Sequence, residues 1–385
     1  MSCRDLSRGA GHWLSASSTE TARIAPAAPV SGEAGGLALA EPAPTVSAAH
    51  RLAVSARFGE LYILYMRNLL LAIATLSFYR FWGRTLVRRY LWSHVSLAGD
   101  AFEYAGRGLE LFKGFLGAFV LVGLPMIAFA FLVELDETLL LLIVFMVFWL
   151  LRHFAKFGAH RYRMTRTHWR GIGGSVDGSV WAYAALGIGL DLLMILSLGW
   201  TKPWSDTVLL NYRIRRSWAG TAQARSTLGL GGLYGRYAVS WVIVAVGVGF
   251  VMYLVADNAE TVASFDMLLL ETVLLYLVLP VIWTLGMGIY SIALLRNAVR
   301  ATSLAGLGFR LDVTAWQLAR FRLANYFILI GTVGLGLSYI LLRQVRFAAR
   351  HLEIAGPVEA LVLEQRMNRR IRGEGLAQYL GMDNF

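Results

Sequence analysis

Two long stretches of the sequence contain no lysine and no arginine, one from residue 114 to 151 and one from residue 237 to 295. Each stretch holds two apolar runs separated by a short acidic segment, ELDE in the first and DNAETVASFD in the second. An α-helix rises about 1.5 Å per residue, so about 20 apolar residues span the ~30 Å hydrocarbon core of a bilayer. The pattern predicts two transmembrane hairpins, over residues 113–157 and 236–296, and therefore a mainly α-helical, polytopic membrane protein.

The composition agrees with this class, because 57% of the 385 residues are hydrophobic and only 16% are charged. The net charge of +12 would suggest a nucleic-acid partner in a soluble chain. In a membrane protein, lysine and arginine instead accumulate on the cytoplasmic side. We therefore expect no nucleic-acid partner. We also expect both acidic loops outside the membrane, and both chain termini in the cytoplasm.

A basic, aromatic segment, FYRFWGRTLVRRYLWSH, follows an apolar run that is too short to cross a bilayer. Because basic residues flank that run on both sides, we interpret it as re-entrant or interfacial. Arg80, Arg84 and Arg88 are spaced to form one helical stripe, with Arg89 beside it. The stripe, together with Trp82, predicts contact with anionic lipid headgroups.

The same pattern returns twice without large gaps, which predicts a threefold internal repeat. Thr75 aligns with Ser197 and Thr332, Trp82 aligns with Trp204, and Arg89 aligns with Arg346. Each unit is predicted as an apolar segment, a basic helix and short β-strands at the cytoplasmic face. Trp204 and Arg346 therefore join the predicted headgroup contacts. The predicted order is a disordered tail, three repeats alternating with the two hairpins, and a second tail, at residues 1–45, 46–112, 113–157, 158–235, 236–296, 297–365 and 366–385.

The apolar segments of the second and third repeats, at residues 181–200 and 323–342, are long enough to cross a membrane. Basic residues nevertheless flank both, so re-entrant and crossing segments stay open alternatives. Residues 163–176 and 300–311 follow the two hairpins and are predicted to supply partner strands for the small β patches.

The run TLSFYRFWGRTLVRRYLWSHVSLAGDAFEYAGRGLELFKGF resembles the signature of the YjgN family of bacterial inner-membrane proteins. THWRGIGGSVDGS and LGWTKPW resemble later blocks of that family, and the resemblance extends over about residues 46–380. The chain departs from the pattern at Ser77, where the family usually has glycine, and in lacking a Pro-Trp pair in the third copy. The family is a domain of unknown function, so the resemblance implies an inner-membrane location and no particular activity.

One charged residue, Asp191, lies inside an apolar segment, where ionisable groups are costly and often functional. It is within one position of the repeat level that holds Asn68 and Asn325. The three side chains could converge on a ligand or ion site. Alternatively, each could form a hydrogen bond with a neighbouring helix or a broken backbone end.

No catalytic or cofactor motif occurs, since H-E-x-x-H, G-x-x-x-x-G-K-S/T and G-x-S-x-G are all absent from the sequence. His153, His160 and His168 have no acidic residue at metal-ligand spacing, and Cys3 is the single cysteine. We assign no catalytic residue, metal or cofactor, and whether the protein is an enzyme stays open. Glycine pairs in the apolar segments predict close helix packing or, alternatively, an unwound backbone that lines a ligand.

Two functions fit these features. The first is a transporter or a protein that handles a lipid or small molecule, with the bilayer and an unidentified molecule as partners. The alternative is a non-catalytic membrane scaffold that binds anionic lipid or partner proteins at the cytoplasmic face. The sequence does not identify a substrate, an energy source or an oligomeric state.

Overall fold

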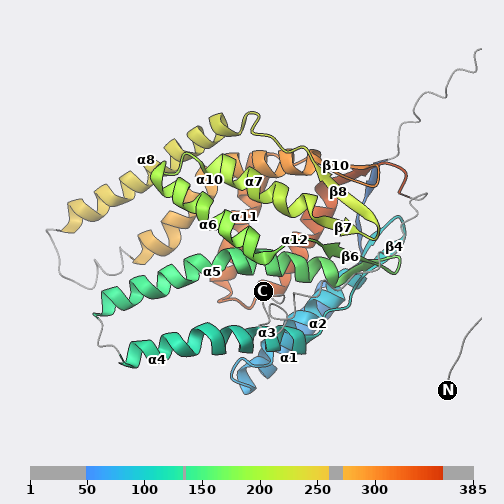
Figure 1. Cartoon of the computed structure of the whole chain (residues 1–385), viewed down its shortest axis with the longest axis horizontal. Helices are drawn as coiled ribbons and strands as arrows, with labels where there is room; N and C mark the ends of the chain where they lie inside the picture. The colour runs from blue at the N-terminus through green and yellow to red at the C-terminus, as the bar shows by residue number, and fades with distance from the viewer. Residues whose placement is uncertain (1–48, 133–135, 260–271, 359–385) are drawn as a thin grey trace, which may run out of the picture. The chain divides into compact units, whose positions relative to one another are not determined.

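The computed structural model describes residues 49–132, 136–259 and 272–358 (Figure 1). The chain divides into two units, Met1–Thr45 and Val46–Phe385, and the described residues belong to the second. Both predicted tails lie outside the described residues, as do part of ELDE and most of DNAETVASFD.

Among the described residues, four helices are long and apolar enough to cross a membrane, and they fall in the two predicted hairpins. They are Gly108–Ala130, Glu137–Thr165, Leu233–Ala256 and Tyr276–Arg300. The first hairpin consists of α3 (Gly108–Ala118), η1 (Phe119–Gly123), α4 (Leu124–Leu132) and α5 (Glu137–Thr165). The second consists of α8 (Leu233–Ala259), η2 (Leu274–Val278) and α10 (Leu279–Arg300).

Each hairpin contains a π-helical turn just before a proline, with η1 ahead of Pro125 and η2 ahead of Pro280. Proline has no backbone N–H, and its ring clashes with the carbonyl one turn earlier. A π-helical turn adjusts the hydrogen-bond pattern at that point. The two prolines therefore alter their helices locally and do not end them.

Three shorter helical pairs alternate with these hairpins. They are α1 (Phe58–Ala74) with α2 (Arg80–Ser93), α6 (Val180–Leu196) with α7 (Lys202–Arg215), and α11 (Ala315–Gly331) with α12 (Leu337–His351). In each pair the apolar helix has 17 residues and a five-residue turn leads directly into the basic helix. The chain therefore leaves each pair at the end where it entered.

The three turns are built alike. In each turn a hydroxyl accepts a hydrogen bond from the backbone N–H four residues later. Thr75 accepts from Tyr79, Ser197 accepts from Thr201, and Thr332 accepts from Gly336. The next two residues have left-handed backbone angles, and the pairs are Leu76–Ser77, Leu198–Gly199 and Val333–Gly334. The second position is glycine in two turns, which is the residue that adopts this conformation without steric cost.

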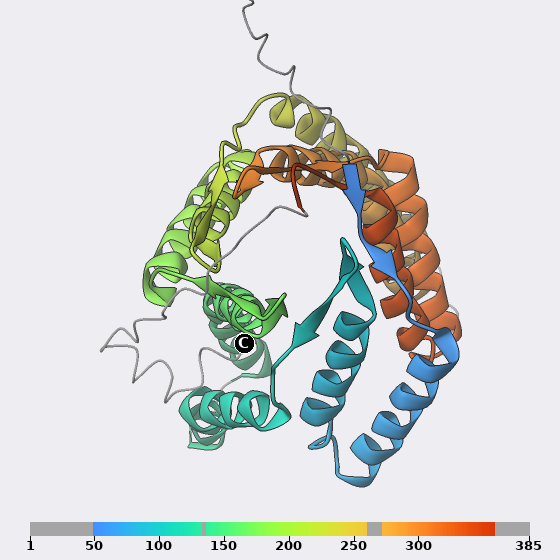
Figure 2. The ribbon, with the colours of Figure 1, turned by 90° about the vertical axis from the view of Figure 1, so that its right-hand side faces the viewer.

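The strands form one eleven-stranded sheet (Figure 2). Four β-hairpins, each with a two-residue loop, supply eight of the strands. They are β3 (Val95–Leu97) with β4 (Asp100–Tyr104), β5 (Thr167–Trp169) with β6 (Ile172–Val176), β7 (Ser217–Ala219) with β8 (Ala222–Ser226), and β9 (Thr302–Leu304) with β10 (Leu307–Leu311). The remaining strands are β1 (Ala49–Arg51), β2 (Ala53–Val54) and β11 (Leu352–Ala355). The sheet order begins at β1 and ends at β2. Only Leu52 separates these two strands in the chain, so the sheet is nearly closed.

Contacts between the two ends of the domain close this sheet. His50 of β1 pairs with Ile354 of β11, and Arg51 forms a 2.5 Å salt bridge with Glu353. Leu97, Leu307 and Ile354 form one buried cluster, which joins side chains from three separate strands. The sequence predicted small separate β patches, but each isolated hairpin would leave two unpaired edges, and joining the hairpins satisfies those edges.

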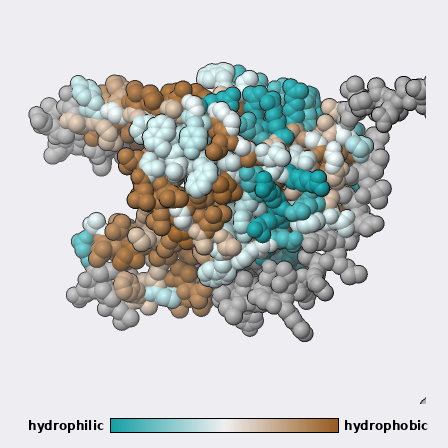
Figure 3. Space-filling model, turned by 45° about the horizontal axis from the view of Figure 1, so that its top comes forward, coloured by the Kyte–Doolittle hydropathy of each residue, from teal (hydrophilic) through white to brown (hydrophobic). Residues whose placement is uncertain are grey.

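Each of the first four helical pairs is followed by a β-hairpin, and the fifth is followed by β11, which pairs with β1. Hydrophobic residues gather over the half that contains the long helices, while hydrophilic residues gather toward the end with the strands (Figures 1 and 3). The described domain therefore has an apolar helical end and a polar sheet end, which is consistent with a mainly helical membrane protein.

Candidate functional site

A buried ionic cluster joins α5 to α6. Asp191, in α6, is only 6% exposed, and its Oδ2 atom accepts hydrogen bonds from two side chains of α5. Arg152 donates from Nη2, and His153 Nε2 lies 2.6 Å away with its ring 1% exposed. The carboxylate is therefore paired inside an apolar region, where an unpaired charge would be strongly unfavourable.

The helices fit closely around this cluster. A Cβ atom at Gly187 would lie 2.2 Å from His153 Nδ1, so only glycine leaves room for the imidazole. Tyr183 packs edge-on against the same ring, with centroids 6.2 Å apart, and Trp149 lies 5.5 Å from the Arg152 guanidinium. These contacts fix the positions of Arg152 and His153 beside Asp191.

Polar atoms of the cluster remain available. Among the described residues, His153 Nδ1 and Arg152 Nε are buried and have no hydrogen-bond partner. The cluster therefore contains buried polar groups whose hydrogen-bonding capacity the described residues do not use.

The sequence identifies Asp191 but not its partners, because Arg152 directly follows the arginine-free stretch that ends at residue 151 and has no pattern that links it to residue 191. A signal was present. A single charge in an apolar segment requires a compensating partner, and Arg152 and His153 directly follow the apolar run of α5.

Asn68 and Asn325 are also buried, 6% and 9% exposed, within the apolar helices of their own pairs. Asn68 donates a 3.4 Å hydrogen bond to the carbonyl of Gly83 in α2, and Asn325 accepts one of 3.1 Å from Arg343 in α12. The hydrogen bonds of Asp191, Asn68 and Asn325 thus lead to separate partners in α5, α2 and α12. The structure does not join the three side chains into one hydrogen-bonded group.

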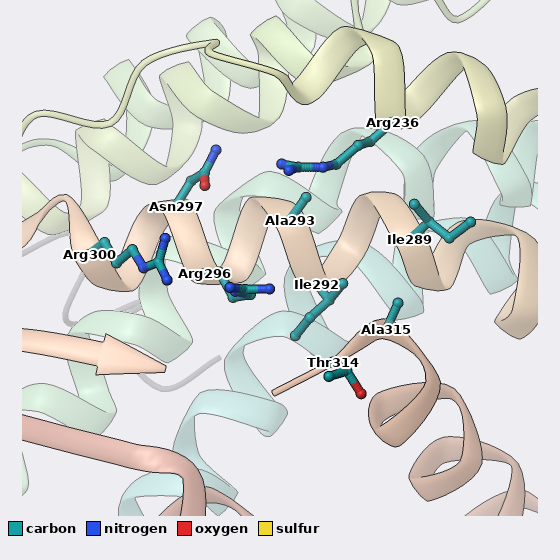
Figure 4. A pocket seen from close by; sticks show the side chains of 9 residues that line it. All are labelled: Arg236, Ile289, Ile292, Ala293, Arg296, Asn297, Arg300, Thr314 and Ala315. Atoms are coloured by element: carbon teal, nitrogen blue, oxygen red, sulfur yellow. The ribbon is translucent and has the colours of Figure 1, made fainter. Parts of the chain in front are cut away.

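Two cavities with basic walls lie among the helices. One, of about 250 Å³, lies between α8, α10 and the start of α11 (Figure 4). Arg236 extends toward it from α8, while Arg296 and Arg300 approach from α10. The other, of about 420 Å³, lies between α2, α5 and α7 and is lined by Arg84, Arg88, Leu111, Ala155, Lys156, Ala159, Tyr162, Arg163 and Arg213.

A family model described as a bacterial protein of unknown function, DUF898, matches residues 49–379. The chain belongs to the DUF898 family. No curated protein and no solved structure is significantly similar to it. The DUF898 match begins at the first residue of β1 and continues past β11, so the family domain includes both strands that close the sheet. The resemblance to YjgN is consistent with this assignment.

The predicted headgroup residues of the DUF898 protein make contacts within the chain. Arg80 lies 5.0 Å from the ring centre of Phe81, and Trp82 packs 5.7 Å from Phe112. Other contacts are from Arg88 to the Tyr104 hydroxyl at 3.3 Å, from Arg89 to the Gly106 carbonyl at 3.3 Å and from Arg346 to the Ala56 carbonyl at 2.9 Å. Arg84 lines the larger cavity, and Trp204 is 38% exposed. Their contact with lipid stays a prediction.

Proposed function

We propose that this DUF898 protein is a multi-pass bacterial inner-membrane protein that binds and transports, or otherwise handles, a small molecule or lipid. The main support is the pairing of Asp191 with Arg152 and His153 between α5 and α6. Buried ionisable groups at membrane depth are rare and commonly belong to substrate or proton pathways. The cluster joins α5, which is long and apolar enough to cross a bilayer, to the shorter apolar helix α6.

We propose the orientation in which the sheet end faces the cytoplasm. The polar surface around the strands and the absence of lysine and arginine from the two long stretches support it (Figure 3). Both termini of the domain meet at this sheet end, since β1 pairs with β11. The N- and C-termini would then both be cytoplasmic.

We also propose that the three short helical pairs are copies of one internal repeat. The identical hydroxyl-capped turns and the equal lengths of α1, α6 and α11 support this. In each copy the apolar helix returns directly into the basic helix. That arrangement favours re-entrant segments over complete crossings.

The test compares the lipids and small molecules that copurify with the full-length protein and with Asp191→Asn in a neutral detergent. Asp312→Asn is the control, because Asp312 is exposed on the sheet side of the domain. We expect Asp191→Asn to lose a bound molecule that both other proteins retain, at an equal folded fraction in size-exclusion chromatography. The proposal fails if the wild-type protein carries no such molecule, or if Asp191→Asn carries the same amount.

A second candidate is a scaffold that gathers anionic lipid at the cytoplasmic face, supported by the hydrophilic surface at the sheet end (Figure 3). It predicts that Arg84→Glu combined with Arg88→Glu weakens binding to cardiolipin vesicles, whereas Asp191→Asn does not. Vesicle flotation measures both. Unchanged flotation of the double variant would exclude this function.

A further inference from the structure

The larger cavity has an unusual charge distribution. Five of its nine lining residues are cationic, and none is acidic. Arg84 and Arg88 come from α2, Lys156 and Arg163 from α5, and Arg213 from α7. Side chains that are far apart in the sequence thus place five positive charges around about 420 Å³ of space.

No carboxylate in the described part of the chain forms an ion pair with these cations, although Asp191 interacts electrostatically with Lys156. Arg88 donates to the neutral hydroxyl of Tyr104, and Arg213 Nε is buried without a hydrogen-bond partner. Burial, together with the nearby Arg80 and Arg88, lowers the pKa of the Arg84 guanidinium, which reflects this crowding of like charge.

Helix dipoles can stabilise only some of the five cations that line the cavity. The negative end of a helix dipole favours cations within its last turn. Arg163 and Arg213 each lie two residues before the ends of α5 and α7, and dipoles can stabilise them. Arg84 and Lys156 lie nine residues before the ends of α2 and α5, beyond that range. Helix dipoles therefore do not offset the repulsion that each of these two cations experiences from its cationic neighbours.

We propose that this cavity binds the phosphate group of a phosphate-bearing ligand. A phosphate offers several acceptor oxygens and up to two negative charges, and guanidinium groups match its geometry with paired N–H donors. Arg84, Lys156 and Arg163 are exposed, so an entering ligand can reach them. This inference assigns a substrate class, phosphate-bearing molecules, to the proposed function, and it rests on that function to this extent.

The remaining wall suits a ligand that also has an apolar part. Leu111 of α3 and Ala155 and Ala159 of α5 line the same cavity. Both helices belong to the first membrane-length hairpin. A lipid headgroup and a free phosphate ester share the chemistry that the cations recognise, and they differ in whether they use this apolar wall.

The experiment measures binding to the full-length protein in a neutral detergent by isothermal titration calorimetry. The probes are inorganic phosphate, short-chain phosphatidylglycerol and short-chain phosphatidylcholine. The cavity variant is Lys156→Gln combined with Arg213→Gln. The control is Arg225→Gln combined with Arg350→Gln, which removes the same charge from two exposed positions outside the cavity. Arg213→Lys, which retains the charge, serves if the double variant is poorly folded.

We expect wild-type and control proteins to bind phosphate or phosphatidylglycerol, and the cavity variant to bind about tenfold or more weakly, because two charge-assisted contacts are lost. Arg213→Lys is expected to weaken binding less. Tighter binding of phosphatidylglycerol than of phosphate, with phosphatidylcholine weak, identifies an anionic headgroup. Equal binding of phosphate and phosphatidylglycerol identifies a free phosphate ester.

The inference is overturned if wild-type protein binds neither anionic probe, or if the cavity and control variants bind equally. Asp191→Asn separates this result from the test of the proposed function, because Asp191 does not line the cavity. Loss of the copurifying molecule in Asp191→Asn together with absent phosphate binding would leave the proposed function standing and remove its assigned substrate class.

Discussion

At the scale of single residues, the structure explains why particular positions need glycine and what happens where glycine is missing. Ser77 has a φ angle of 71°, whereas the same position of the other two turns holds Gly199 and Gly334. An L-residue in this left-handed region costs about 1–2 kcal/mol. The departure from the family pattern at Ser77 is therefore a local strain that the surrounding turn tolerates.

Replacing Ser77 with glycine should relieve that strain. Since the greater chain entropy of glycine in the unfolded state offsets part of the gain, we expect Ser77→Gly to stabilise the protein by about 0.5–1 kcal/mol. The converse change, Gly199→Ser, should cost about 1 kcal/mol. Thermal unfolding in detergent measures both, with Gly229→Ser as a control at an open position without a positive φ. A lower melting temperature for Ser77→Gly would contradict the prediction.

Gly187 provides a second test at this scale, because its missing side chain makes room for His153. Gly187→Ala would place a methyl group against the imidazole, and we expect it to destabilise the α5–α6 contact by about 1–3 kcal/mol. Gly189→Ala is the matched control in the same helix, since a Cβ atom at Gly189 would meet no other atom within 4 Å. Equal melting temperatures for the two variants would show that the helices shift freely at this contact.

At the scale of helices and strands, polar contacts near the sheet end hold the first hairpin together. Arg166, the C-cap residue of α5, forms two parallel hydrogen bonds with Glu110 of α3, at 2.9 and 3.0 Å. The Tyr162 hydroxyl donates a third bond to Glu110, at 3.2 Å. Glu110 therefore anchors α3 to α5 at the point where the chain enters β5.

Removing the charge of Glu110 should loosen this anchor. Both partners are partly exposed, so we expect Glu110→Gln to cost only about 1 kcal/mol. Glu103→Gln is the control, because Glu103 is exposed on the neighbouring strand β4. Hydrogen exchange of the last turn of α5 provides the measurement, and faster exchange is expected only in Glu110→Gln. Identical exchange in both variants would assign the anchor to packing alone.

The helices and local strands could be predicted from the sequence, whereas the long-range pairings could not. Lysine-free apolar runs correspond to the four membrane-length helices, and the segments proposed as partner strands contain β5–β6 and β9–β10. Periodicity reports which residues share a face, but it does not report which distant segment covers that face. The pairing of β1 with β11 and the contact of Asp191 with Arg152 both join residues far apart in the chain.

At the scale of the whole described domain, five helical pairs alternate with β-hairpins around one nearly closed sheet (Figure 2). The sequence repeat was predicted in only the three short pairs. The two long hairpins have the same position relative to the strands but much longer apolar helices. Three short and two membrane-length pairs therefore share one framework.

The proposed orientation can be tested with a single introduced cysteine. With Cys3→Ser as the background, Leu86→Cys places a thiol in α2, on the side proposed as cytoplasmic. We expect an impermeant maleimide to label it only in inverted membrane vesicles, because positively charged segments are retained in the cytoplasm. A cysteine within DNAETVASFD should give the opposite pattern. Labelling of position 86 in intact spheroplasts would reverse the orientation.

The pairing of β1 with β11 has a consequence for biosynthesis. β1 leaves the ribosome about 300 residues before β11, as Ala49 and Ala355 are partners. Throughout that interval β1 lacks β11, the one strand with which it pairs, so this pairing can form only near the end of translation. Truncated nascent chains should therefore expose a β edge that chaperones can recognise.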